Sequence, residues 1–231
     1  LTLYNEPIVQ PAEPENVDVE GINKGLYLLK EGSFDGVGQD ARRAQLLDQI
    51  GVAHRALVAG ADEDVERLEA ERRGESPEDY VRRVTRAKLR AARRRLATRA
   101  LADAPILCAD TTVALGRRIL GKPDDAGHAM DMLRALSGRS HRVLSAVALS
   151  CGRAAPLRLS VSRVRFAVLP EPFIRAYAES GEPLGKAGAY AVQGCIAQWI
   201  ERIEGSYTGI MGLPLFETRE LLARARVFHG P

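Results

Sequence analysis

The feature that most constrains the fold is a pair of long β-patterned stretches that follow each other closely along the chain. Residues 142–149 and 157–169 are rich in apolar residues, and the second stretch alternates apolar with polar side chains. Two strands so close in sequence form an antiparallel hairpin, because a parallel pair needs a long crossover connection. The alternation slips near Arg163, which predicts a β-bulge there. The sequence therefore favours a mixed sheet over a doubly wound parallel one.

Other strands and helices are expected on both sides of this hairpin. A strand at 26–29 precedes a glycine-rich loop that runs through Gly38, and a short apolar run at 105–109 leads into Asp110. Caps and helical periodicity predict helices at 42–50, 76–101, 125–136, 172–180 and 214–225, with extended segments within 189–203. The predicted fold class is α/β, with an elongated mixed sheet flanked by helices.

Length and composition bound the domain count. A chain of 231 residues that is 45% apolar can bury one core, or two small lobes that share a cleft. Residues 1–25 contain three prolines and no apolar period. We therefore expect a loosely ordered extension there and one domain over 26–231. No run approaches the roughly 20 apolar residues of a membrane helix and no basic-then-apolar leader is visible, so we expect a cytoplasmic protein.

The distribution of arginines and the spacing of cysteines argue against a nucleic-acid surface, a metal site and a disulfide framework. Arginines gather at 82–99, but apolar residues recur among them at helical spacing, which favours a solvated helix face over a nucleic-acid surface. Cys108, Cys151 and Cys195 are far apart and odd in number, so they predict neither a metal site nor a disulfide framework. We expect them to be buried thiols.

Several polar residues are candidates for chemistry, although each is ambiguous alone. Asp110 is expected at the end of a rigid strand, which suits a metal ligand or a general base, or equally an aspartate bonded to nearby backbone. Lys122 lies in a stiff turn before Pro123 and can return a cation toward that carboxylate. Glu63 offers a second carboxylate for Mg²⁺, or it is a capping or solvated residue. Lys88 taken alone is one more charge on the arginine-rich helix.

The order of the motifs resembles the Maf family of nucleoside triphosphate pyrophosphatases over about residues 26–225. These motifs are Ser76-Pro77 with Tyr80-Val81, Ala87-Lys88, Ala109-Asp110-Thr111, Gly121-Lys122-Pro123, Leu136-Ser137-Gly138-Arg139 with His141, Gly181-Glu182-Pro183, Lys186-Ala187-Gly188-Ala189-Tyr190, Gly205-Ser206-Tyr207 and Gly212-Leu213-Pro214-Leu215. Several motifs in the right order and spacing are far more specific than any one of them.

The resemblance implies hydrolysis of a nucleoside triphosphate between its α- and β-phosphates with a divalent cation, Mg²⁺ or Mn²⁺. It implies a fold similar to inosine triphosphate pyrophosphatases, with two lobes around a cleft, and it suggests a homodimer. By position in the motifs, Asp110 is the proton acceptor and Glu63 its acidic partner, and both are metal ligands. Lys88 and Lys122 would bind phosphates, and Gln193 would recognise the base.

Residues after the aspartate indicate the branch of the family. The chain resembles the branch that acts on dTTP and UTP at Thr111, in the segment that begins at Lys186, and at Gln193. The branch resembling 7-methyl-GTP pyrophosphatases has glutamine after the aspartate instead. A side-chain amide can pair with the donor and acceptor edge of uracil or thymine. We therefore expect dTTP and UTP as substrates, with these three residues in the substrate site.

The match is weakest at the opening motif of the family, Ser-x-Ser-Pro-Arg-Arg. Arg42 and Arg43 match its substrate-binding arginines, but Gly38-Gln39-Asp40-Ala41 precedes them, without the serines and the proline. Asp40 adds negative charge where phosphates are expected, and like charges about 4 Å apart repel by several kcal/mol near a surface. Either the loop binds phosphates through glycine N–H groups, or Asp40 turns outward, or the chain is a Maf-like nucleotide-binding or cell-division regulatory protein with weak or no catalysis.

Overall fold

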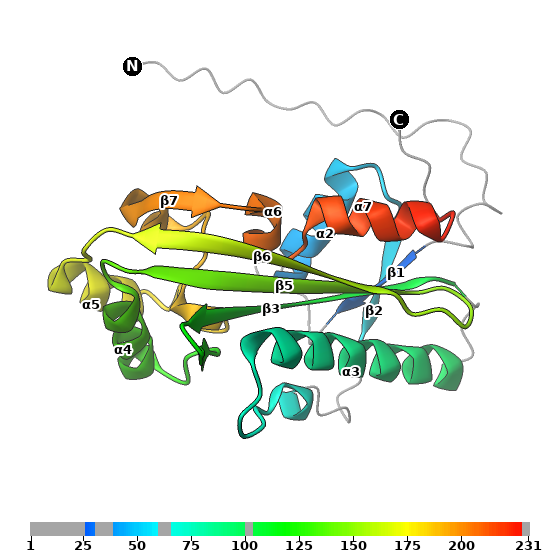
Figure 1. The fold of residues 1–231 in the computed structure, drawn as a ribbon, viewed down its shortest axis with the longest axis horizontal. Helices are drawn as coiled ribbons and strands as arrows, with labels where there is room; N and C mark the ends of the chain where they lie inside the picture. The colour runs from blue at the N-terminus through cyan, green and yellow to red at the C-terminus, as the bar shows by residue number, and fades with distance from the viewer. Residues whose placement is uncertain (1–25, 31–38, 60–65, 100–103, 228–231) are drawn as a thin grey trace, which may run out of the picture.

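A mixed sheet of seven strands forms the centre of the molecule (Figure 1). The computed structural model describes residues 26–30, 39–59, 66–99 and 104–227. Its strands are β1 (Leu26–Lys30), β2 (His54–Val58), β3 (Ile106–Leu115), β4 (Arg118–Leu120), β5 (Ser140–Ser150), β6 (Leu157–Phe166) and β7 (Ile200–Glu204). The order across the sheet is β2-β1-β3-β5-β6-β7, and β4 pairs with β3. Because β1 is parallel to β2 and β3 while the other pairs are antiparallel, the mixed sheet is confirmed.

The predicted hairpin is the long antiparallel pair β5 and β6. The bulge predicted near Arg163 lies two residues further along the chain, and β6 alternates regularly between buried and exposed residues from Ser160 to Phe166. The irregularity lies between Arg165 and Phe166, where the register of β6 with β7 shifts. The extended segments expected within 189–203 reduce to β7 and two short 3-10 helices, η2 (Ala187–Ala189) and η3 (Cys195–Trp199).

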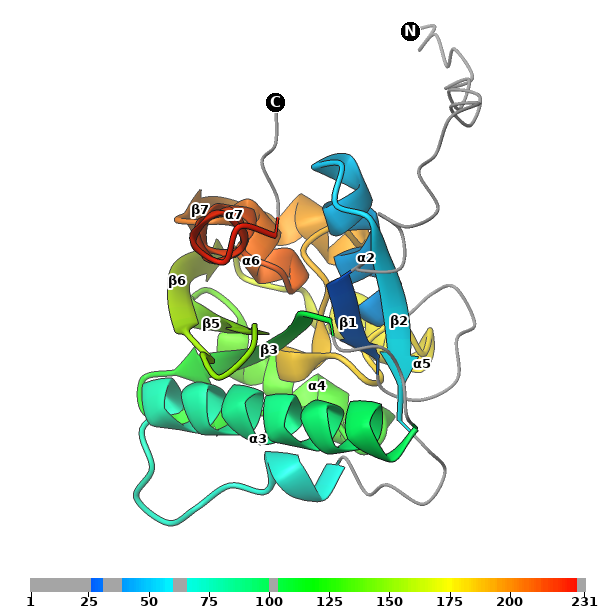
Figure 2. The ribbon, with the colours of Figure 1, turned by 90° about the vertical axis from the view of Figure 1, so that its right-hand side faces the viewer.

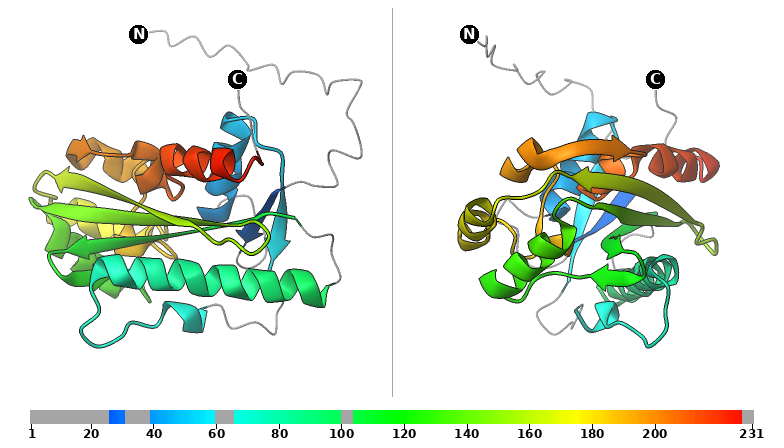
Figure 3. Two further views of the ribbon diagram at one scale, coloured as in Figure 1. Left: turned by 45° about the vertical axis from the view of Figure 1, so that its right-hand side comes forward. Right: turned by 60° about the vertical axis from the view of Figure 1, so that its left-hand side comes forward.

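Helices cover both faces of the sheet. They are α2 (Gln39–Gln49), α3 (Pro77–Thr98), α4 (Ala126–Leu136), α5 (Glu171–Glu179), α6 (Tyr207–Met211) and α7 (Leu215–Arg224), with a 3-10 turn η1 (Glu66–Glu69) before α3. Helix α3 runs along β3 and β5 on one face, while α2, α6 and α7 lie on the opposite face (Figures 2 and 3). The five predicted helices are therefore present, and α6 is additional.

Helix α3 begins where the sequence predicts. The hydroxyl of Ser76 accepts a hydrogen bond from the Asp79 amide, and Pro77 occupies the first turn, where a missing N–H costs no bond. The buried face of α3 includes three polar residues, Thr85, Lys88 and Arg95. Most other arginines of 82–99 are exposed or partly exposed, which confirms the solvated face.

A polar row divides the apolar core on the face opposite α3. One cluster packs Leu107, Ala109, Val147 and Leu149 against α2 and α7, and another packs Val113, Val143 and Val164 against α4 and α5. Between them, Thr111 of β3 lies directly opposite Ser145 of β5, which in turn lies opposite Ser160 of β6. The polar row marks the boundary between the two apolar clusters, and the expected division into two lobes around a cleft stays a prediction.

Two expectations concern the termini and the thiols. The extension predicted at 1–25 lies outside the described residues. The expectation of buried cysteines holds for Cys108 alone, since Cys151 is partly buried and Cys195 is exposed.

Candidate active site

Asp110 lies in the middle of β3, not at its end as the sequence analysis expects. The strand continues because Thr111, Thr112 and Val113 are β-branched and pair with β5. On the other edge of β3, β1 pairs at Ile106 and Leu107, and β4 pairs from Val113 onward. Asp110 therefore lies on a rigid strand, within the stretch of β3 between the residues that pair with β1 and those that pair with β4.

Lys88 links Asp110 to a second carboxylate. Its Nζ donates to Oδ1 of Asp110 at 2.6 Å and to Oε1 of Glu69 at 2.7 Å. The lysine side chain is 2% exposed, so its charge is taken out of water and depends on these two partners. A surface role for Lys88 is therefore wrong. The register could have shown this, because Lys88 is four residues from Val84 and from Ala92 on the buried stripe.

Glu69 is the residue that sequence reasoning missed. It ends η1, and the first turns of α3 hold this segment: the Tyr80 hydroxyl donates to the Glu69 carbonyl at 2.8 Å, and Arg83 donates to the carbonyls of Leu68 and Ala70. Glu63, the predicted second carboxylate, lies outside the described residues. No local pattern distinguishes Glu69, because its contact with Lys88 spans 19 positions and depends on how η1 folds onto α3.

Lys122 approaches the same cluster through Glu69. Its Nζ is 3.1 Å from Oε2 and 3.3 Å from Oε1 of that carboxylate, and the side chain is 38% exposed. The residues Glu69, Lys88, Asp110 and Lys122 are called the ionic cluster below. It joins η1, α3, β3 and the turn after β4, and one of its two lysines faces solvent.

Burial and neighbouring charges shift the two carboxylates in opposite directions. Burial raises the pKa of Asp110, and the cations of Lys88 and Arg43 only partly oppose it. Burial also acts to raise the pKa of Glu69, but Lys88 and Lys122 outweigh it, so that pKa is lowered. Glu69 is thus held as the anion, while Asp110 is the better proton acceptor.

The opposite face of β3 carries two paired hydroxyl groups and a buried arginine. Oγ1 of Thr111 is 2.8 Å from Oγ of Ser145, which is 2.6 Å from the Gly209 carbonyl in α6. Arg43 is buried and donates from Nε to the Gly212 carbonyl at 3.1 Å. Gly212 has φ of 119°, which favours glycine, and it brings the loop after α6 toward Arg43 and Thr111.

Gln193 and Arg42 meet over a small hollow on this face. With its amide oriented to satisfy both partners, the Gln193 oxygen accepts from Arg42 Nε at 2.8 Å and Nη1 at 3.2 Å. Thr111, Tyr190 and Met211 are among the other lining residues. The hollow holds about 20 Å³, enough for a water molecule. A base would therefore need Arg42 or another lining side chain to move.

Lys186 lies at the edge of the same region. Its Nζ donates to the carbonyl of Glu182, and burial together with the nearby Arg42 lowers its pKa, against the opposing charge of Glu182. The structure thus brings Arg42, Lys186 and Gln193 together on the face opposite Asp110, as the predicted substrate residues require.

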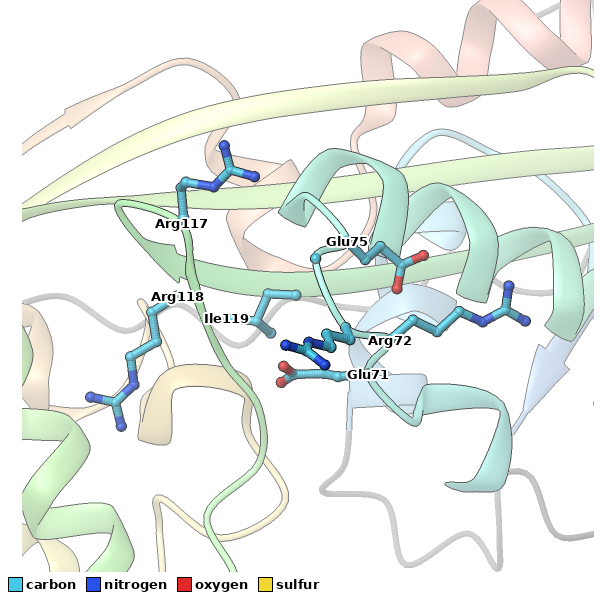
Figure 4. A pocket seen from close by; sticks show the side chains of 8 residues that line it. Glu71, Arg72, Glu75, Arg117, Arg118 and Ile119 are labelled. Atoms are coloured by element: carbon cyan, nitrogen blue, oxygen red, sulfur yellow. The ribbon is translucent and has the colours of Figure 1, made fainter.

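A larger hollow of about 510 Å³ lies between the loop before α3 and the turn from β3 to β4 (Figure 4). Arg72, Arg73, Arg117 and Arg118 line it, with Glu71 and Glu75 among them. Glu75 is paired with Arg83 at 2.7 Å. The hollow is formed by exposed turn residues and contains none of the four members of the ionic cluster.

A family model described as Maf-like protein matches residues 39–225, most of the chain. The chain belongs to the Maf-like protein family. The match begins at the first residue of α2, so Gly38 and the residues before it lie outside it. Gly38 also lies outside the described residues. Asp40 is in the first turn of α2.

Curated relatives of the Maf-like chain share one printed name, dTTP/UTP pyrophosphatase. The protein of Polaromonas sp. (strain JS666) is 59% identical over 187 residues, covering 81% of this chain and 93% of the relative. The protein of Cupriavidus pinatubonensis is 55% identical over 82% of this chain and 94% of its own length. That of Ralstonia nicotianae is 56% identical over 82% and 92%. In the part of the chain that the structure describes, no helix has the length and apolarity to span a membrane.

The ionic cluster fits a divalent cation of the Mg²⁺ or Mn²⁺ type. Such ions prefer oxygen ligands and are held by one or two carboxylates together with water and substrate phosphates. Glu69 and Asp110 supply two carboxylates that converge on one ammonium group. Asp110 retains a second oxygen beyond the one bound to Lys88, whereas the second oxygen of Glu69 contacts Lys122 and would have to exchange that contact for the cation. Glu63 lies outside the described residues, so the predicted ligand pair of Glu63 and Asp110 stays a prediction, and Glu69 is a carboxylate that the structure adds to it.

Proposed function

We propose that this protein hydrolyses dTTP and UTP to the nucleoside monophosphate and pyrophosphate. The observation that carries the proposal is the buried Lys88, held at 2.7 and 2.6 Å between Glu69 and Asp110 beside a second lysine. The printed names of relatives 55% to 59% identical support the same reaction. In it, water adds to the α-phosphorus, the bond to the bridging oxygen breaks, and pyrophosphate leaves with that oxygen.

The charges of the cluster suit this reaction. Asp110 takes the proton of the attacking water, because burial raises its pKa and one of its oxygens is not engaged by Lys88. Lys122 is exposed enough to bind a phosphate, and Lys88 and Arg43 keep positive charge close to Asp110. A rigid strand and a packed helix hold these groups, so little reorganisation is needed when charge develops.

Glu69 and Asp110 would hold the divalent cation. When bound, such an ion neutralises phosphate charge and polarises the phosphoryl oxygens. Lys122 then binds a phosphate from the solvent side, and Lys88 keeps the two carboxylates at a fixed separation.

Base recognition belongs to the opposite face of β3. Gln193 can present donor and acceptor together, Thr111 adds a hydroxyl, and Arg42 covers the hollow between them. Base entry would exchange the Arg42–Gln193 contact for contacts with the nucleotide, so this pair fits the role of a gate over the base site.

Pyrophosphate release from a panel of nucleoside triphosphates with Mg²⁺ or Mn²⁺ tests the proposal. We expect release from dTTP and UTP well above that from the other nucleotides. If no nucleotide releases pyrophosphate, the protein is not a pyrophosphatase. Thermal stabilisation by UTP without release would establish the alternative, a nucleotide-binding protein without turnover.

A matched pair of variants tests the second carboxylate. Glu69→Gln should lower kcat by about 100-fold, because the amide cannot balance the two lysines or bind the cation. Glu63→Gln, its control, should keep the rate within about twofold, because the proposal assigns the second carboxylate to Glu69. The reverse result would restore Glu63 as the partner of Asp110. The homodimer stays a prediction, which light scattering after gel filtration would check.

A further inference from the structure

Ser145 and Thr111 are coupled across two strands. The register of β3 and β5 places them directly opposite each other, with side chains on the same face, and their hydroxyl oxygens are 2.8 Å apart. Ser145 is 1% exposed, and its Oγ is also 2.6 Å from the Gly209 carbonyl. Thr111 lines the small hollow that Gln193 and Arg42 close.

Counting protons fixes the direction of this chain of hydrogen bonds. A serine hydroxyl has one proton, and a carbonyl oxygen can only accept. The proton of Ser145 therefore points to Gly209, which leaves the Ser145 oxygen as an acceptor toward Thr111. Thr111 must donate its own proton to Ser145. Its oxygen then offers only lone pairs to a molecule in the hollow.

The other polar groups of the hollow supply hydrogen-bond donors beside the Thr111 acceptor. The Arg42 guanidinium is a donor with no acceptor, and the Gln193 amide can turn its N–H toward a ligand once Arg42 no longer engages its oxygen. The hollow can therefore present donors from Arg42 and Gln193 together with the Thr111 acceptor. Uracil and thymine carry the complementary edge, a carbonyl, an imide N–H and a second carbonyl.

We propose that Ser145 is a positioning residue that makes Thr111 an acceptor and thereby selects uracil and thymine over cytosine. This inference rests on the proposed function and adds the origin of its base selectivity. Cytosine has an unprotonated N3 where uracil has N–H, so its lone pair would face the lone pair of Thr111. Rejection follows from an unpaired polar contact and not from size, because the three bases have similar shapes.

The test is the ratio of kcat/KM for UTP to kcat/KM for CTP. Ser145→Ala releases the Thr111 proton, which can then turn into the hollow and donate to N3 of cytosine. We expect the ratio to fall by about tenfold, the size of one misplaced hydrogen bond. Ser145→Thr keeps the hydroxyl and should restore the wild-type ratio.

Ser162→Ala is the matched control. Ser162 is also a buried serine of the same sheet, and its Oγ donates to the Ser206 carbonyl at 3.1 Å, at the start of α6. The substitution removes a similar tether to the same helix but does not touch the Thr111 pair. Thermal midpoints of both alanine variants should fall alike, while the UTP-to-CTP ratio should change only for Ser145→Ala.

The outcomes separate this inference from the proposed function. A wild-type enzyme that prefers UTP and a Ser145→Ala variant with the same preference would overturn the role of Ser145 and leave the activity in place. An equal change of the ratio in Ser162→Ala would also overturn it, because disturbance of α6 would then explain the effect. Absence of pyrophosphate release by the wild type would instead remove the proposed function itself.

Discussion

Asp110 and Thr111 are neighbours in the sequence, but β3 directs their side chains to opposite faces of the sheet. On the α3 face, Asp110 belongs to a cluster of four charged residues. On the other face, Thr111 belongs to a row of hydroxyls and amides that exchange neutral hydrogen bonds. The difference teaches that one rigid strand can present a carboxylate for the phosphates on one face and hydroxyl dipoles for the base on the other, while Arg43 from the second face still acts on Asp110.

The largest effect should come from the charged face. Asp110→Asn removes the proton acceptor but preserves the shape of the side chain, so we expect kcat for UTP to fall by about 1,000-fold. Binding of a non-hydrolysable UTP analogue, measured by thermal shift, should persist, because the Thr111 face, which binds the base, is intact. A kcat within about tenfold of wild type would show that another group accepts the proton.

A second effect concerns a buried histidine on the Thr111 face of the sheet. His141 is 2% exposed and its Nε2 lies 2.7 Å from the Tyr190 hydroxyl, and burial lowers its pKa to about 4 from 6.5. Because the folded pKa is the lower one, the unfolded state binds more protons below pH 6.5, and stability falls as the pH drops toward 4. From pH 7 to pH 5 the loss should be about 2 kcal/mol.

Urea unfolding at the two pH values measures this loss. His141→Gln keeps a neutral hydrogen-bonding group beside Tyr190 and cannot be protonated, so the wild type should lose about 2 kcal/mol more than this variant does. His128→Gln, on the exposed surface of α4, should retain the wild-type difference. Equal losses in wild type and His141→Gln would show that His141 does not titrate as its burial requires.

A smaller effect concerns the base. Gln193→Ala removes the amide that faces Arg42, and kcat/KM for UTP should fall by about tenfold, mostly through KM. The value for CTP should change less, which narrows the selectivity. A fall in kcat alone would place Gln193 with the charged face and break the division between the two faces.

The smallest effect is expected in the arginine-lined hollow. Arg118 begins β4 and lines a hollow that contains no member of the ionic cluster, so Arg118→Ala removes a cation away from that cluster. We expect kcat and KM for UTP to stay within about twofold of wild type. A larger rise in KM would extend the phosphate-binding surface beyond Lys122.

Sequence reasoning succeeded where local patterns determine the structure. The cap at Ser76 predicted the start of α3, and the alternation in β6 predicted the hairpin. The family motifs pointed to Asp110 and Lys122 as site residues. Lys88 could be assigned to the substrate site only through the resemblance, although its place on the buried stripe of α3 was a usable signal.

The features that the sequence did not predict depend on contacts between segments that are distant along the chain. Glu69 enters the cluster because Tyr80 and Arg83 fold η1 onto α3, and no periodicity in η1 reports this. Asp110 was expected at a strand end because its apolar run stops there, whereas pairing with β5 extends the strand through the polar Thr111 and Thr112. The Arg42–Gln193 contact likewise joins residues about 150 positions apart.

The most direct test of the division between the faces is the UTP-to-CTP ratio of kcat/KM in Glu69→Gln and Thr111→Val. Glu69→Gln should lower both values by the same factor, so that the ratio stays at the wild-type level. Thr111→Val should reduce the ratio by about tenfold, since it removes the acceptor for the imide N–H. A ratio that shifts equally in the two variants would contradict the account, because chemistry and base selection would then share one set of residues.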